Sequence, residues 1–264
     1  MSDPRVPPGL AVVPGVAALR VDHGPLFAVV GVFDGLHVGH AYLLRHLVDE
    51  AARRSSRPAV VTFDHHPDEV LVGSAPPLLV DPADRLALLR AAGVEVAIVE
   101  HFDAALRMTP YDAFVARITG HVRLAGLVMT PDAAFGHERR GTPEALRVLG
   151  AASDPPFEVV VVAPFTLDDR PVSSSEIRRL VAAGDLAGAA RLLGRPFAVV
   201  GEADGSGVVS YPMPVALPPP GDYPVSIATV DDGGAVSGVA RIGADGRLAL
   251  VGGALPAGML RIVF

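Results

Sequence analysis

Apolar residues follow two alternating periodicities along the first two thirds of the chain. Short β-branched runs predict buried parallel strands at 27–32, 58–63, 94–99, 126–129 and 157–163. Apolar residues three and four positions apart predict helices at 41–54, 84–92, 110–119, 143–149, 176–183 and 186–193. This alternation predicts an α/β fold with an open, mostly parallel sheet and helices on both faces. Ligands of such sheets bind beyond the carboxyl ends of the strands.

The pattern differs at both ends of the chain. Residues 1–25 are rich in Pro, Gly and Val and predict an irregular lead-in. After Gly194, β-type runs at 198–200, 225–230, 236–242, 248–251 and 260–264 are separated by Gly, Pro and Asp. Such spacing without a helical period predicts a small antiparallel sheet or barrel. We therefore expect two domains, over residues 1–190 and 191–264.

Composition narrows the functional classes. The chain has 264 residues and a net charge of −7, which disfavours nucleic acid as a partner. It contains no cysteine, which excludes disulfides and thiol nucleophiles, and no lysine, which excludes a Walker A loop. Arginine, histidine and backbone N–H groups must therefore handle any phosphate. No secretory leader is visible and no apolar run reaches about 20 residues, so we expect a cytoplasmic location and no membrane partner.

The segment after the first predicted strand, from Gly31 to His40, carries the strongest chemical signal. Its glycines let a phosphate approach the backbone, and the following helix offers N–H groups and its dipole to an anion. His37 and His40 are three residues apart, so they share one face of a first helical turn. Two imidazoles there can stabilise a phosphoryl group that gains charge during displacement. A glycine-rich turn with incidental histidines, or half a metal site, is the alternative interpretation.

A second segment, from Pro171 to Arg178, opens a later helix with three serines. Serine is a common N-cap, and ordinary capping with an exposed Arg178 would explain the segment by itself. Together with the first motif, phosphate binding is favoured, because hydroxyls and a guanidinium at a helix N-terminus suit a polyphosphate.

The remaining histidines are not grouped at metal-ligand spacing, so we predict no protein metal site. We interpret them as surface or core residues: His23, His46, His101, His121 and His137.

The string G-x-F-D-G-x-H-x-G-H resembles the signature of the bacterial bifunctional riboflavin kinase/FMN adenylyltransferases, within the HxGH nucleotidyltransferases. Residues 172–178 resemble the family motif (I/V)-S-S-T-x-I-R. Residues 62–71 resemble T-F-x-P-H-P-x-E-V-L, with His65 at the first proline, and 128–141 resemble V-V-G-x-D-F-R-F-G-x-x-R-x-G. The resemblance implies a Rossmann-like domain that transfers AMP from ATP, with Mg²⁺, to FMN, giving FAD and pyrophosphate.

The same resemblance implies roles for individual residues. The catalytic group would be His37, His40 and Arg178. The ATP site would be Gly31, Phe33, Asp34, Gly39, Ser173, Ser174 and Ser175, and the acceptor site would be Phe63, His66, Pro67, Asp132 and Phe135.

Departures from the family pattern keep two alternatives open. Ala133 and Ala134 replace the family's Phe and Arg, which are the side chains that a planar, phosphorylated flavin would use. A nucleotidyltransferase with another phosphorylated acceptor is therefore one alternative, and a catalytically silent nucleotide- or flavin-binding protein is the other. Acceptor identity, base preference and oligomeric state stay open.

The C-terminal region departs further. Residues 210–215 lie where the family's riboflavin-kinase barrel has G-(F/Y)-P-T-A-N, and Met213 and Val215 replace the Thr and Asn that serve Mg-ATP. Neither side chain can coordinate Mg²⁺. The chain also ends before the family's catalytic glutamate strand. We therefore expect a degenerate, truncated barrel without riboflavin kinase activity.

Overall fold

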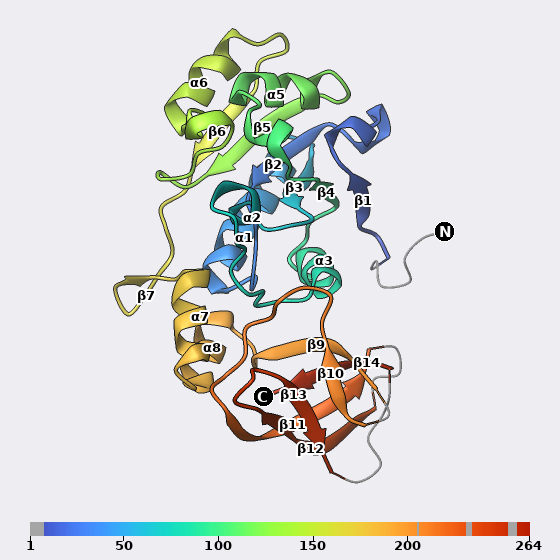
Figure 1. Ribbon diagram of the computed structural model, residues 1–264. Helices are drawn as coiled ribbons and strands as arrows, with labels where there is room; N and C mark the ends of the chain where they lie inside the picture. The colour runs from blue at the N-terminus through green and yellow to red at the C-terminus, as the bar shows by residue number, and fades with distance from the viewer. Residues whose placement is uncertain (1–7, 205, 231–233, 253–257) are drawn as a thin grey trace. The chain divides into compact units, whose positions relative to one another are not determined.

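The computed structural model describes residues 8–204, 206–230, 234–252 and 258–264, which form two compact units (Figure 1). Unit 1 comprises Met1–Phe33, Gly39–Pro76 and Pro82–Thr166, and unit 2 comprises Asp34–Val38, Pro77–Asp81 and Leu167–Phe264. Two short segments of the N-terminal half thus pack with the C-terminal half. The predicted domain boundary near residue 190 remains a prediction, since these units are defined by packing.

Unit 1 is built on a parallel sheet. Within the described residues it has six strands in the order β1 (Ala11–Pro14), β4 (Val96–Glu100), β3 (Arg57–Phe63), β2 (Leu26–Val30), β5 (Leu124–Met129) and β6 (Glu158–Val161). From β2 the chain moves one way to β3 and β4, and β5 and β6 lie on the other side. The order therefore reverses between β2 and β5, where open α/β sheets bind their ligands.

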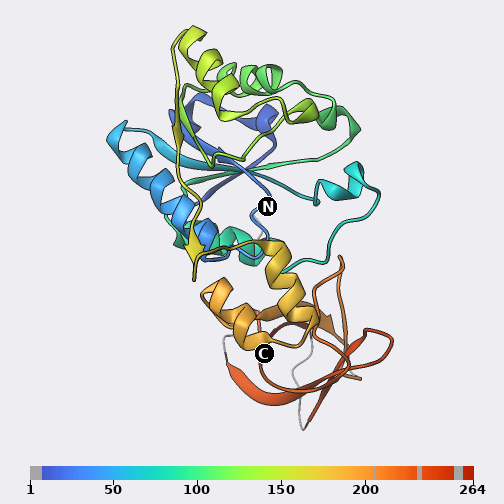
Figure 2. The same ribbon diagram turned by 90° about the vertical axis from the view of Figure 1, so that its left-hand side faces the viewer.

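Helices cover both faces of this sheet. In Figure 2, α5 (Tyr111–Thr119) and α6 (Pro143–Ala152) lie on one face, and α1 (Val38–Arg53) and α3 (Pro82–Ala91) lie on the other. Shorter helices, α2 (Asp68–Leu71) and α4 (Ala104–Arg107), and a 3₁₀ turn, η3 (His137–Arg139), occupy the connections. The α/β class expected from the alternating periodicities is confirmed.

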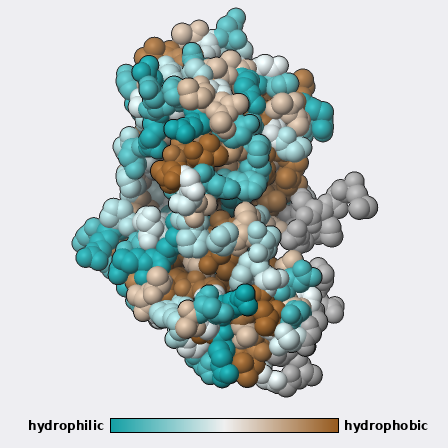
Figure 3. Space-filling view, viewed as in Figure 1, coloured by the Kyte–Doolittle hydropathy of each residue, from teal (hydrophilic) through white to brown (hydrophobic). Residues whose placement is uncertain are grey.

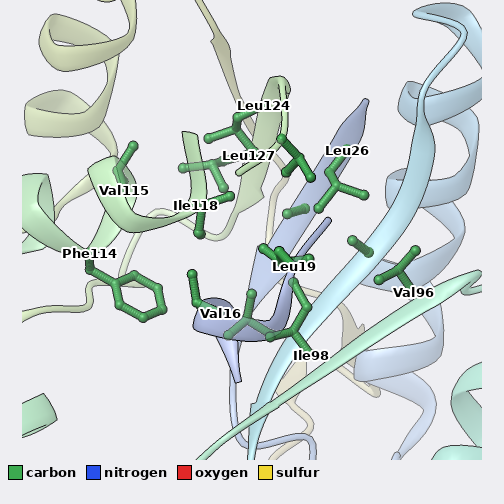
Figure 4. Close-up of a cluster of buried hydrophobic side chains, with 14 of the residues drawn as sticks. Val16, Leu19, Leu26, Val96, Ile98, Phe114, Val115, Ile118, Leu124 and Leu127 are labelled. Carbon is green, nitrogen blue, oxygen red and sulfur yellow. The ribbon is translucent and has the colours of Figure 1, made fainter. Parts of the chain in front are cut away.

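The main core of unit 1 fills the space between the sheet and α5. Successive strand residues point to opposite faces, so alternate positions of β2 and β4 share one apolar layer. Leu124 and Leu127 of β5 join it across an irregularity in the pairing with β2. Figure 4 shows how α5 and the first 3₁₀ turn pack onto that layer. The labelled side chains are Val16, Leu19, Leu26, Val96, Ile98, Phe114, Val115, Ile118, Leu124 and Leu127.

Unit 2 contains a closed antiparallel barrel. Its strand order is β10 (Val208–Ser210), β13 (Leu248–Val251), β12 (Ala235–Ile242), β11 (Gly221–Thr229), β14 (Gly258–Val263) and β9 (Ala198–Ala203). The barrel expected from the sequence is thus confirmed, and β10, which is only three residues long, joins β9 to β13. Helices α7 (Ser174–Ala182) and α8 (Leu186–Leu193) share its core through Ile177, Val181, Ala189 and Leu193. The two-residue strands β7 (Thr166–Leu167) and β8 (Arg170–Pro171) pair with each other and precede α7 in the chain.

The expected irregular lead-in is wrong for most of its length. Residues 1–7 lie outside the described residues, but β1 pairs in parallel with β4 from Ala11↔Val96 to Pro14↔Val99. Two 3₁₀ turns, η1 (Val16–Ala18) and η2 (Val21–His23), follow. A four-residue strand that ends on proline shows too little alternation to be recognised, and its pairing with β4 fixes it instead.

The surface is mixed in polarity. On the face seen in Figure 3, hydrophilic and hydrophobic residues are interspersed over both units. No helix among the described residues is long and apolar enough to span a membrane.

Candidate functional site

The chain leaves β2 through a tight turn in unit 1. Phe33 is buried and has a positive φ of 54°, and a Cβ built on Gly31 would lie 3.0 Å from its ring. Only glycine fits at position 31 without moving that ring. The ring of Phe33 also contacts that of His40, with 5.0 Å between centroids. Gly31 and Phe33, expected at the ATP site, thus shape the turn and support one of the two motif histidines.

A buried arginine braces the carboxyl ends of two strands in the same unit. Arg85 of α3 donates from Nη1 to the carbonyl of Val32 at 3.2 Å and from Nη2 to that of Phe63 at 2.7 Å. The Thr62 hydroxyl donates to the same Val32 carbonyl at 3.0 Å. These bonds fix the loops that follow β2 and β3. The sequence analysis missed Arg85, because only the fold brings α3 to those carbonyls.

Asp34 is the central residue of the site in unit 2. Its carboxylate is only 3% exposed, accepts the backbone N–H of Leu79 at 3.0 Å, and forms an ion pair with the guanidinium of Arg178. Its own carbonyl accepts the hydroxyl of Ser174 at 2.8 Å. Asp34 is expected at the ATP site, and that role stays a prediction. Its observed contacts hold α7 and the 77–81 segment together.

The start of α7 uses its serines in three different ways. Ser173 is the N-cap, since its Oγ accepts the N–H of Glu176 at 3.2 Å, whereas Ser174 binds Asp34 as described above. Ser175 is exposed. Arg178 donates from Nε to the Pro77 carbonyl at 2.8 Å in addition to its ion pair, which engages two of its five N–H donors. The hydroxyls of Ser173 and Ser174 therefore fix the start of α7.

His37 lies at the end of the Asp34–Val38 segment, just before α1, and is buried. Arg195 clamps this segment, donating to the carbonyls of Gly35 at 2.7 Å and Leu36 at 3.2 Å. Burial, and after it the positive charge of Arg195, lowers the pKa of His37 to about 4. The imidazole is therefore neutral at neutral pH and keeps one N–H to donate. No sequence motif described above includes Arg195, and only its contacts reveal a role at the Gly31–His40 motif.

The second motif histidine lies in the first turn of α1. His40 and Gly39 are both partly buried there, and His40 belongs to unit 1. The nucleotide motif thus spans the strand end, the turn and the helix start, as its glycine spacing indicated.

The expected acceptor residues of the loop after β3 are partly buried. Phe63 packs edge-on against Phe102, with 5.3 Å between ring centroids. Nδ1 of His66 accepts the N–H of Asp68 at 3.2 Å, so a neutral His66 carries its proton on Nε2. Pro67 precedes α2 directly. These contacts orient a histidine that can donate to an anion.

The loop after β5 holds the other expected acceptor residues. Asp132 is exposed, and its carbonyl accepts a bond from Arg139 at 3.1 Å. Phe135 turns toward the core, where its ring lies 5.8 Å from that of Phe114, and Ala133 packs against the same cluster. The Phe135 ring therefore packs in the core, and its role at the acceptor site stays a prediction.

The parallel α/β fold and the Gly31–His40 motif at the end of β2 together define the class of protein. The molecule is an α/β nucleotidyltransferase-like domain followed by a six-stranded barrel. The model of the FAD synthetase family matches residues 20–176, and the chain belongs to that family. The match includes both motif histidines and Ser174 but ends before Arg178 and Arg195.

Curated relatives carry the name bifunctional riboflavin kinase/FMN adenylyltransferase. The chain is 35% identical to that of Haemophilus influenzae over 175 residues, which are 65% of this chain and 56% of the relative. It is 32% identical to that of Pseudomonas fluorescens over 193 residues, covering 73% and 61%. The matched region thus spans little more than half the length of these relatives.

One solved structure is similar over nearly the whole chain. It is described as a macrolide-efflux protein from Streptococcus pneumoniae, with a TM-score of 0.80, 21% identity and coverage of 97% of this chain and 89% of that one. At this identity the similarity concerns the fold alone.

Proposed function

We propose that this protein transfers the adenylyl group of ATP to FMN, giving FAD and pyrophosphate. One observation carries the proposal. Asp34 is joined by direct bonds to Ser174 and Arg178, which lie 140 and 144 residues later in the chain. The second motif by itself favoured ordinary capping, and phosphate binding was favoured for it only together with the first. Their union around one buried carboxylate is therefore support for a single polyphosphate site.

The reaction would need positioning and charge stabilisation, and no side-chain nucleophile. A phosphate oxygen of FMN attacks the α-phosphorus of ATP, a new P–O bond forms, and the bond to the bridging oxygen of the β-phosphate breaks in line. His37 and His40 would donate hydrogen bonds to the α-phosphoryl oxygens, where charge develops. The N-terminal N–H groups of α7, with Ser175 and Arg178, would bind the β- and γ-phosphates.

Mg²⁺ would enter as the complex with ATP and neutralise phosphate charge. The carboxylate of Asp34 is engaged by Leu79 and Arg178. The remaining donors at the motif are hydroxyls and the phosphate oxygens themselves, which suit an ion that keeps several water ligands.

The acceptor would use the loops after β3 and β5. His66 would donate from Nε2 to its phosphate, and Asp132 would orient its polar edge. Ala133 and Ala134 provide neither a ring nor a guanidinium. They support the alternative that another phosphorylated acceptor is used, and the assay must separate the two.

The test is an incubation of the purified chain with Mg-ATP and FMN, following FAD and pyrophosphate by chromatography. The variant His40→Ala should lower turnover by about 100-fold or more, because it removes a donor to the transition state. His121→Ala is the matched control, since His121 is exposed and follows α5, outside the residues assigned to the site.

Each outcome is informative. FAD formation that depends on His40 and not on His121 supports the proposal. Pyrophosphate release with a different mononucleotide, but not with FMN, favours the alternative acceptor. ATP binding without product in any tube favours a silent nucleotide-binding protein.

A further inference from the structure

A cluster of two histidines and one aspartate lies in unit 1, among residues to which adenylyl transfer gives no role. Asp64 and His65 directly follow β3, and His101 directly follows β4. The two strands are parallel neighbours (Figure 1), and the N–H of Asp64 donates to the carbonyl of Glu100 at 3.1 Å, just beyond their last paired residues. The fold thereby joins side chains that are 37 residues apart.

The three side chains are close enough to share one ion. Asp64 Oδ2 lies 2.6 Å from His101 Nδ1, and Asp64 Oδ1 lies 3.2 Å from His65 Nδ1. One ligand atom from each residue falls within 4.8 Å of the others. The imidazole rings are nearly perpendicular, at 86° and 6.0 Å between centroids. Two imidazole nitrogens and a carboxylate oxygen therefore converge on one small volume.

We propose that Asp64, His65 and His101 bind a divalent transition-metal ion, with Zn²⁺ as the preferred occupant. Zinc prefers imidazole and carboxylate donors, and catalytic-type sites use three protein ligands and leave a fourth position to water. Tetrahedral bonds of about 2.0 Å place ligand atoms about 3.3 Å apart. The hydrogen-bonded atoms of Asp64 and His101 are closer than this and must separate slightly. The side chains of His65 and His101 are 46% and 67% exposed, which leaves them room to move.

The surroundings of the carboxylate support this assignment. Asp64 Oδ1 accepts the backbone N–H groups of His65 at 2.7 Å and Phe102 at 3.3 Å, which fix its orientation as outer-shell bonds do at metal sites. Mg²⁺ prefers oxygen ligands and should not compete.

One proposed ligand, His65, is a departure from the family pattern. It stands where the family pattern has the first proline of T-F-x-P-H-P, so the ligand set does not follow from the motif. His101 lies outside every motif, and the sequence analysis therefore interpreted it as an isolated surface or core residue. The parallel pairing of β3 and β4 makes the two histidines neighbours.

The test is a titration of the tag-free, full chain with Zn²⁺ by calorimetry in excess Mg²⁺, with Co²⁺ absorption as a second readout. We expect one ion per chain and a Co²⁺ spectrum typical of nitrogen and oxygen ligands. His65→Ala and His101→Ala should each weaken binding by at least about 10-fold. His121→Ala should leave it unchanged and serves as the matched histidine control.

Absence of saturable binding would overturn the proposal. So would equal weakening in all three variants, which would mean that surface histidines bind zinc at random. Unchanged zinc affinity in His65→Ala and His101→Ala would show that the three side chains form a hydrogen-bonded cluster and not a metal site. Because the readout is metal binding rather than FAD formation, failure here is distinguishable from failure of the proposed adenylyl transfer.

Discussion

Burial changes the chemistry of single side chains in this protein. His37 is 5% exposed and lies beside the clamping arginine, Arg195, so the proton that a free histidine would take up near pH 6.5 is held off until about pH 4. A neutral imidazole does not attract ATP as an ion, but it can donate one directed hydrogen bond. Transition-state stabilisation requires such a fixed donor.

The same shift predicts how stability depends on pH. A histidine whose pKa is lower in the folded state than in the unfolded state stabilises the fold fully above the unfolded value of 6.5, and this contribution is lost as pH falls toward about 4. At about pH 5 the loss should be about 2 kcal/mol. His37→Gln cannot take up the proton. Urea unfolding at several pH values should therefore show the free-energy gap between the native chain and this variant shrinking on acidification. A constant gap would show that His37 titrates normally.

At the scale of elements, α7 is an anchored helix. Three of its first residues reach backbone or carboxylate groups, and its apolar residues Ile177 and Val181 are fully buried. Arg178 and Arg179 are adjacent on this helix but differ in environment. The side chain of Arg178 is 15% exposed and pairs with buried Asp34, whereas that of Arg179 is 63% exposed and pairs with Glu176.

These two arginines form a matched test. Arg178→Ala should destabilise the protein by about 3 kcal/mol, because it leaves a buried carboxylate unpaired, and it should also weaken ATP binding. Arg179→Ala should leave stability nearly unchanged, because an exposed ion pair contributes little. Adding Asp34→Asn to Arg178→Ala should restore part of the stability without restoring ATP affinity. Chemical denaturation and an ATP titration measure the two effects, and recovery of both would remove Arg178 from nucleotide binding.

The sequence predicts an element well when local residues determine its ends, and poorly when pairing with distant strands determines it. Helix 186–193 was predicted at its observed bounds, because Gly184–Asp185 and Gly194 punctuate it locally. By contrast, β1 and β10 are only four and three residues long and depend on pairing with distant strands. The motif histidines were found from local spacing. Arg85, Arg195 and the partnership of His65 with His101 depend on the tertiary fold, so no local pattern reports them.

At the scale of the whole molecule, the barrel is closed within the described residues. Val215 forms a backbone bridge with Leu78 and packs against the core of unit 2. The buried hydroxyl of Tyr211 finds no hydrogen-bond partner among the residues that the structure describes, and burial raises its pKa. We therefore predict that the segment that resembles the kinase motif contributes packing and no ligand set for a magnesium nucleotide.

This predicts the outcome of a simple assay. Riboflavin incubated with the full chain and Mg-ATP should yield no FMN, because Met213 and Val215 offer no hydroxyl or amide oxygen to the ion. Chromatography of the flavins is the measurement, with added FMN as a recovery standard. FMN formation at a rate proportional to protein would contradict this view of the barrel.

Because Asp34–Val38 packs with residues after 166, this segment can complete its folding only late in synthesis on the ribosome. The segment that contains Asp34 and His37 is synthesised early, but Arg178, the partner of that carboxylate, emerges 144 residues later. Until then the strands around β2 can assemble and Leu79 can bind the carboxylate of Asp34, but that carboxylate has no arginine partner. A gene cut after the sheet would therefore encode a scaffold whose signature segment carries an unpaired carboxylate.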